Sequence, residues 1–164
     1  MEIELAEPVE PACAMEVLNK NLPDGIRVLE CDIIDRKSDR KLMAMLAGAS
    51  YEISVPCADA KKFIAAVGEY NSMASLFYTK KTAPKKPSKQ VDVKEFIPEV
   101  VCEESADGVK LCFDCKITPA GTLKAHDLLK VFKEQFGLDF DILACDVMRT
   151  RLYKEGKQSL LYNS

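Results

Sequence analysis

The sequence lacks several features that would announce a chemistry. It has no tryptophan and one histidine, and its seven glycines never cluster. Without a glycine-rich loop it carries neither a dinucleotide fingerprint nor a P-loop. A Ser–His–Asp or Cys–His arrangement would have to use His126, the only histidine. No ligand pattern typical of metal-dependent hydrolases is present. The sequence therefore predicts no metal and no cofactor.

Long apolar runs are also missing. The longest uncharged stretches, Leu42–Tyr51 and Tyr70–Thr79, have ten residues each, whereas a membrane-spanning helix needs about 20. The opening residues MEIELAEPVEP are acidic, unlike a signal peptide. The chain has 164 residues, 48% of them hydrophobic, and a net charge of −3. This composition excludes a disordered chain and a strongly basic nucleic-acid module. We expect a soluble, cytoplasmic protein with no membrane partner.

The seven cysteines are scattered, as expected of small buried side chains in a reducing compartment. Cys112 and Cys115 have the CxxC spacing of zinc and redox sites. However, they lie in VKLCFDCKI, whose alternation predicts a strand. Residues three apart on a strand point to opposite faces. The pattern favours structural cysteines, with metal or redox work as the alternative.

The apolar periodicity of residues 1–79 predicts the order β-α-β-(short α)-β-α-β. We expect strands at 2–7, 26–35, 51–56 and 73–79, and helices at 12–21, from Ser38 through Leu46, and at 58–71. This is the split βαβ pattern of a ferredoxin-like βαββαβ unit with one helical insertion.

A Lys/Pro-rich connector at 80–90 separates this unit from a second one at 91–155, followed by a tail at 156–164. The second unit begins with a short strand or turn and a single helical turn in VDVKEFI. A hairpin around Asp107-Gly108, a helix from about Leu123 to Phe136 and a last strand with a possible irregularity follow. We predict an α+β fold with antiparallel sheets and helices on one face, the second unit being a partial ferredoxin-like ββαβ unit.

The connector is the first candidate binding site, because closely spaced ammonium groups attract phosphate or acidic protein surfaces. Phe77 and Tyr78 precede it and could stack on bases. A solubilising linker is the competing interpretation. The candidate binding residues here are Lys80, Lys81, Lys85, Lys86 and Lys89.

The second candidate is the pair Arg149 and Arg151. Two arginines separated by one strand residue are expected on the same face of a sheet, where they would bind an anion or pair with acids. Asp92 is a further candidate, because an enzyme built on paired side chains could use it with Arg149. His126 is expected on the basic flank of its helix, beside Lys130 and Lys133, rather than in a catalytic arrangement.

Four segments of the chain resemble a known family, the uncharacterised radical SAM-linked proteins. They are IELAEPVEPACAMEVLNKNLPDGIRVLEC, MAMLAGASYEISV, QVDVKEFI and DVMRTRLY. The run NLPDGIRVLE is the most distinctive, since family members carry a closely similar LPxGIRVLEA. Members look longer at the N-terminus, so the resemblance implies that a preceding segment is lacking here. Asp92, Arg149 and Thr150 lie in the recurring motifs.

The resemblance implies an accessory role. Members occur beside, or fused to the C-terminus of, a cobalamin-binding-type radical SAM protein, and their genes lie near those for a ribonuclease and ribosomal proteins. The chain lacks the three clustered cysteines of a radical SAM cluster. The resemblance therefore implies a domain without catalysis of its own that presents RNA or a protein substrate to a radical SAM partner. An RNA-modifying or RNA-binding enzyme and a purely structural docking domain are the alternatives.

Overall fold

The computed structural model describes residues 3, 5–33, 42–80, 89–119 and 121–157. The chain divides into two compact units, one spanning Leu46–Gln158 and the other including Met1–Met45. Each is described by itself.

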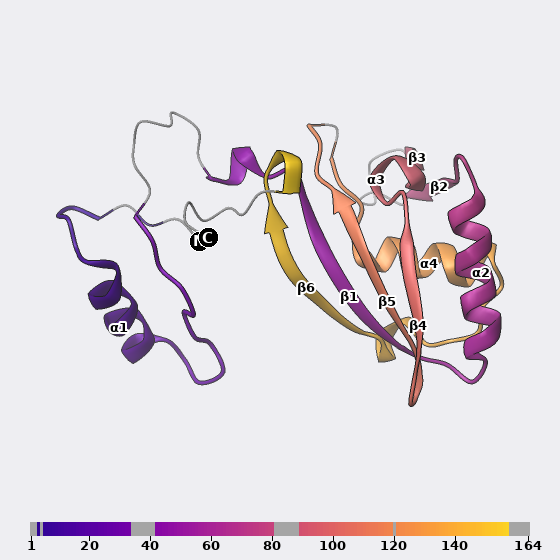
Figure 1. Ribbon diagram of the computed structural model, residues 1–164, viewed down its shortest axis with the longest axis horizontal. Coiled ribbons are helices and arrows are strands. Elements are labelled where there is room, and N and C mark those ends of the chain that lie inside the picture. The colour runs from indigo at the N-terminus through magenta and orange to yellow at the C-terminus, as the bar shows by residue number, and fades with distance from the viewer. Residues whose placement is uncertain (1–2, 4, 34–41, 81–88, 120, 158–164) are drawn as a thin grey trace. The chain divides into compact units, whose positions relative to one another are not determined.

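The unit spanning Leu46–Gln158 holds both sheets. Its strands are β1 (Gly48–Pro56), β2 (Phe77–Lys80), β3 (Lys89–Asp92), β4 (Val100–Ser105), β5 (Gly108–Lys116) and β6 (Asp146–Tyr153). Its α-helices are α2 (Ala60–Ser72), α3 (Val93–Phe96) and α4 (Ala125–Gln135), and its 3₁₀ helices are η2 (Ile142–Ala144) and η3 (Glu155–Lys157). Four strands form an antiparallel sheet in the order β4-β5-β1-β6, shown in Figure 1, while β2 and β3 form a separate hairpin.

The predicted mixed fold with antiparallel sheets and helices is confirmed. The elements around the four-stranded sheet follow the order β1-α2-β4-β5-α4-β6, which has the pattern of a split βαβ arrangement. Strands from before and after the predicted connector share this sheet. The ferredoxin-like assignment and the limits 1–79, 80–90, 91–155 and 156–164 stay predictions.

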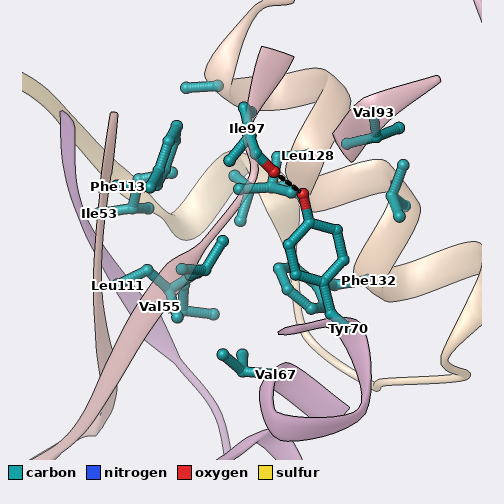
Figure 2. Close-up of a cluster of buried hydrophobic side chains, with 14 of the residues drawn as sticks. Ile53, Val55, Val67, Tyr70, Val93, Ile97, Leu111, Phe113, Leu128 and Phe132 are labelled. Carbon is teal, nitrogen blue, oxygen red and sulfur yellow. Dashed lines mark hydrogen bonds between the residues drawn. The ribbon is translucent and has the colours of Figure 1, made fainter. Parts of the chain in front are cut away.

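The core lies between one face of the sheet and the helices. Alternate residues of β1 and β5, including Ile53 and Leu111, are fully buried against α2 and α4. Figure 2 shows Phe132 of α4 and Val67 of α2 facing these strands. The Tyr70 hydroxyl donates to the Ile97 carbonyl oxygen, so its polar end is satisfied within the core.

The β4–β5 turn requires glycine. Gly108 has φ 153°, and a Cβ there would overlap the carbonyl oxygen of Val55 on β1. The predicted Asp107-Gly108 hairpin is therefore confirmed, together with the reason for its glycine. The predicted strand and single helical turn of VDVKEFI are also confirmed, as β3 and α3.

The N-terminal unit contains α1 (Pro11–Asn21) and the 3₁₀ helix η1 (Leu42–Met45). The helix predicted at 12–21 is confirmed, with Pro11 at its start. The strands predicted at 2–7 and 26–35 are not formed over the described residues 3, 5–7 and 26–33. A strand needs a hydrogen-bonded neighbour, and the described part of this unit contains no other strand.

Without a sheet to pack against, many apolar side chains of this unit stay exposed. No residue of α1 is buried. The large apolar side chains that remain exposed in the unit are Ile3, Leu5, Val9, Val17, Ile26, Leu29 and Ile33. One local substitute for strand pairing is present, because the Asn19 side-chain amide accepts from the N–H of Val28 (2.7 Å) and donates to its carbonyl oxygen (3.1 Å).

Candidate functional site

The lysine-rich connector joins the two strands of the β2–β3 hairpin. Lys80 pairs with Lys89 in the strand register, so the connector begins and ends at neighbouring backbone positions. Lys81, Lys85 and Lys86 lie outside the described residues. We call β2, β3 and residues 81–88 between them the lysine hairpin.

The lysine hairpin is anchored to the core. Tyr78 on β2 is buried, and the Gln135 side chain of α4 donates to the Phe77 carbonyl oxygen (2.9 Å). Burial, followed by the charges of Asp127 and Glu134, raises the pKa of Tyr78. Phe77 is 55% exposed. Of the two aromatic residues proposed for stacking, Phe77 therefore presents an accessible ring and Tyr78 belongs to the core.

Asp92 has a structural position. It is the N-cap of α3, and its Oδ1 accepts from the backbone N–H of Leu76 (2.9 Å) and of Lys94 (3.0 Å). The N–H of Val93 also donates to the Leu76 carbonyl oxygen (2.7 Å). Asp92 thus joins the segment before β2 to the start of α3. Within the described residues no ion pair joins it to Arg149, so the structure does not bring together the two groups of the enzyme hypothesis.

A β-bulge separates Arg149 from Arg151. Arg149 pairs with Tyr51 and Arg151 with Ser50, and the register shifts between these two residues of β1. Because Tyr51 and Ser50 are consecutive, they belong to opposite faces of the sheet. The register therefore assigns the two arginines to opposite faces, although their spacing predicts one face. Both side chains are exposed.

Arg149 belongs to the helix-bearing face, next to an aromatic pair. Its register partner Tyr51 stacks on Phe113 of β5, with ring centroids 5.5 Å apart and an interplanar angle of 21°. Tyr51 is half-buried. Arg149, Tyr51 and Phe113 therefore form one cross-strand row, with Arg149 at its β6 end.

Arg151 belongs to the opposite face, near a polar cluster of Ser50, Asp114 and Lys157 that the sequence did not predict. Asp114 accepts from the Ser50 hydroxyl (2.6 Å) and pairs with the Lys157 ammonium (2.6 Å). Partial burial raises the pKa of Asp114, but the bonds from Lys157 and Ser50 and the charges of Lys157 and Arg151 outweigh it and lower the pKa. Strand alternation could have assigned Asp114 to this face, but its partners come from distant segments.

The cysteines have the character of structural thiols. Cys115 is buried and Cys112 half-buried on alternating positions of β5, which confirms that the CxxC pair is divided between the two faces. None of the seven cysteines forms a disulfide. Desolvation by burial, followed by neighbouring charges, raises the pKa of Cys102 and of Cys145 to about 11. Near neutral pH these thiols are protonated and poorly nucleophilic.

Other predicted features have plain outcomes. His126 is exposed on α4, as predicted. Within the described ranges, no group of three His, Cys, Asp or Glu residues could hold a metal ion. None of the helices in the described part is both long and apolar enough to span a membrane.

The fold and these surfaces define an α+β protein with an antiparallel sheet, a lysine-bearing hairpin and a basic edge strand. Over residues 1–130 the chain matches the bacterial family described as "Uncharacterized protein conserved in bacteria" (DUF2344), and it belongs to that family. Comparison with curated proteins and with solved structures gave no match.

Proposed function

We propose that this chain is a non-catalytic accessory domain that binds RNA and presents it to a radical SAM protein. The observation that carries the RNA part is the pairing of Lys80 with Lys89. This pairing brings the first and last lysine positions of the connector together, and Lys81, Lys85 and Lys86 lie between them in the sequence. Ammonium groups that are closely spaced in the sequence favour a polyanion even on a protein whose net charge is −3.

Two anchors support this role. The Gln135–Phe77 bond and the two N–H bonds of Asp92 fix the base of the lysine hairpin on the core. Phe77 is exposed on β2, three residues before Lys80 in the sequence, and offers a ring for base stacking. RNA loops are recognised by this combination of backbone charge and aromatic stacking.

The radical SAM partner is proposed from the resemblance of NLPDGIRVLE and DVMRTRLY to the radical SAM-linked proteins. The non-catalytic role is supported by Asp92, whose Oδ1 is engaged by two backbone N–H groups. The protonated thiols of Cys102 and Cys145 support it as well.

The test of RNA binding is fluorescence anisotropy with labelled tRNA and single-stranded rRNA fragments at several salt concentrations. Five phosphate contacts predict that log K falls against log salt with a slope of roughly −3 to −4. A slope near zero, or no binding at low salt, would refute the RNA part.

The variant that isolates the lysine hairpin is Lys85→Glu with Lys86→Glu. Its control is Lys61→Glu with Lys130→Glu, which changes the net charge equally at exposed positions of α2 and α4. We expect the first pair to weaken RNA binding and the control to change it little. Co-purification with the radical SAM protein is measured in parallel. If the native chain binds no RNA and Lys85→Glu with Lys86→Glu leaves co-purification unchanged, the chain is a docking domain instead.

A further inference from the structure

The two edges of the four-stranded sheet differ in how their backbone is covered. At the β4 edge, the side-chain amide of Asn71, on α2, donates to the Val100 carbonyl oxygen (2.8 Å) and accepts from the Val100 N–H (3.0 Å). Asn71 thus occupies the place of a neighbouring strand where β4 begins. A side chain in this position obstructs the pairing of another chain along β4.

Among the described residues of the unit spanning Leu46–Gln158, nothing comparable covers the β6 edge. β6 is an outer strand of eight residues, visible at one side of the sheet in Figure 1. Its bonds to described residues go to β1 and to Ala47, whose N–H donates to the Tyr153 carbonyl oxygen. Alternate residues of an outer strand direct their N–H and C=O groups away from the sheet.

The charges along β6 restrict what could pair with it. The strand carries Arg149 on one face and Arg151 on the other, with Asp146 at its start. If two copies paired antiparallel through β6 in a register that sets Arg149 or Arg151 opposite an arginine of the other copy, like charges would face each other, which is unfavourable. A second copy offering its β4 edge would meet Asn71 and would build open-ended assemblies. A foreign strand with acidic side chains avoids both problems.

We propose that β6 is a strand-accepting site for an extended acidic polypeptide segment. The segment would add to the sheet beside β6 through main-chain hydrogen bonds, as in β-strand addition. Carboxylates of the segment would lie near Arg149 on the helix-bearing face and near Arg151 on the other. The bulge at Thr150 keeps the uninterrupted pairing short, so the segment spans about five to seven residues.

The first measurement uses four capped seven-residue peptides of threonine and valine labelled with a fluorophore. One has two glutamates near one end, and its control has lysines there. The other two contain the glutamates and carry N-methyl groups on every second backbone amide. In one peptide the odd-numbered amides are methylated, and in the other the even-numbered amides. Methylation on the amides that face β6 should abolish binding, and methylation on the opposite set should leave it intact. Equal binding of the two methylated peptides would overturn the proposal, because attraction between charges alone has no such alternation.

The second measurement changes the protein. Arg149→Glu with Arg151→Glu should weaken binding of the glutamate peptide by about tenfold or more. The same control as for RNA, Lys61→Glu with Lys130→Glu, should leave it within about twofold. Equal losses in both variants would overturn the proposal. Light scattering adds a further outcome: a concentration-dependent dimer that excludes the peptide would assign the β6 edge to a second copy.

The two proposals are separable. The RNA assay depends on Lys85 and Lys86, whereas the peptide assay depends on Arg149 and Arg151. If the chain binds RNA but not the peptide, the β6 edge is misassigned. If it binds the peptide but not RNA, the lysine hairpin is misassigned.

Discussion

Replacing Asp92 tests whether this residue has a catalytic or a structural role. In Asp92→Ala, the N–H groups of Leu76 and Lys94 lose their shared acceptor. Loss of an aspartate N-cap costs about 0.5–2 kcal/mol. The bond to Leu76 adds about 1 kcal/mol, so we expect a loss of about 1.5–3 kcal/mol in the free energy of unfolding. This corresponds to a melting temperature lower by roughly 5–10 °C.

The assay is urea unfolding followed by circular dichroism, with RNA binding measured on the folded variant. Asp92→Asn should recover most of the stability, because asparagine caps helices about as well as aspartate. Asp139→Ala removes the same charge at an exposed position and should be neutral. Full stability of Asp92→Ala would refute the structural account. Normal stability combined with lost function would instead make Asp92 a functional residue.

Three further outcomes test the packing of the sheet. Gly48→Ala would push a Cβ into the Tyr153 ring, so urea unfolding should show a loss of about 1–3 kcal/mol. Tyr70→Phe leaves the buried Ile97 carbonyl without its donor and should cost about 1–3 kcal/mol by the same assay. Burial raises the pKa of Cys102 from 9.0 to about 11, so its stabilising effect should be complete below pH 9 and lost as the pH rises to 11. Cys102→Ala should therefore show a smaller loss of stability than the native chain over that range.

Contradictory results have distinct meanings. An unchanged Gly48→Ala would show that the Tyr153 ring can move away from β1 at little cost. A Tyr70→Phe variant as stable as the native chain would show that water or another donor reaches the Ile97 carbonyl. An identical alkaline profile for Cys102→Ala would show that the thiol titrates at its ordinary pKa.

Local patterns were sufficient to predict the elements that form a sheet. The alternation in 51–56 and 108–117, and the helical periodicity of 58–71, correspond to β1, β5 and α2. These segments bury one face against the others, so hydrophobic period and environment agree. Residues 26–35 are rich in β-branched side chains, which predicts a strand, but the described part of this unit holds no neighbouring strand and none forms at 26–33. Local pattern alone does not report whether a partner strand is present.

The candidate sites depended even more on long-range pairing. Sequence reasoning could select the lysines but not the pairing of Lys80 with Lys89, which needs the hairpin register. It could not find the Ser50–Asp114–Lys157 cluster, whose members come from β1, β5 and η3. Nor could it recognise that the carboxylate of Asp92 is occupied by backbone donors, because Leu76 lies 16 residues away.

The bulge in β6 places the two arginines of the motif DVMRTRLY on opposite faces of the sheet. A regular strand would align Arg149 and Arg151 as a fork for a single anion. One additional residue, Thr150, changes the partner of Arg151 from an odd-numbered to an even-numbered residue of β1. Arg149 is then the register partner of Tyr51, whereas the charge of Arg151, after the contributions of Lys157 and Ser50, helps to lower the pKa of Asp114. Replacing Arg151 should therefore raise the pKa of Asp114, while replacing Arg149 should leave it unchanged. Carboxyl NMR titration of the two variants distinguishes this division from a shared site.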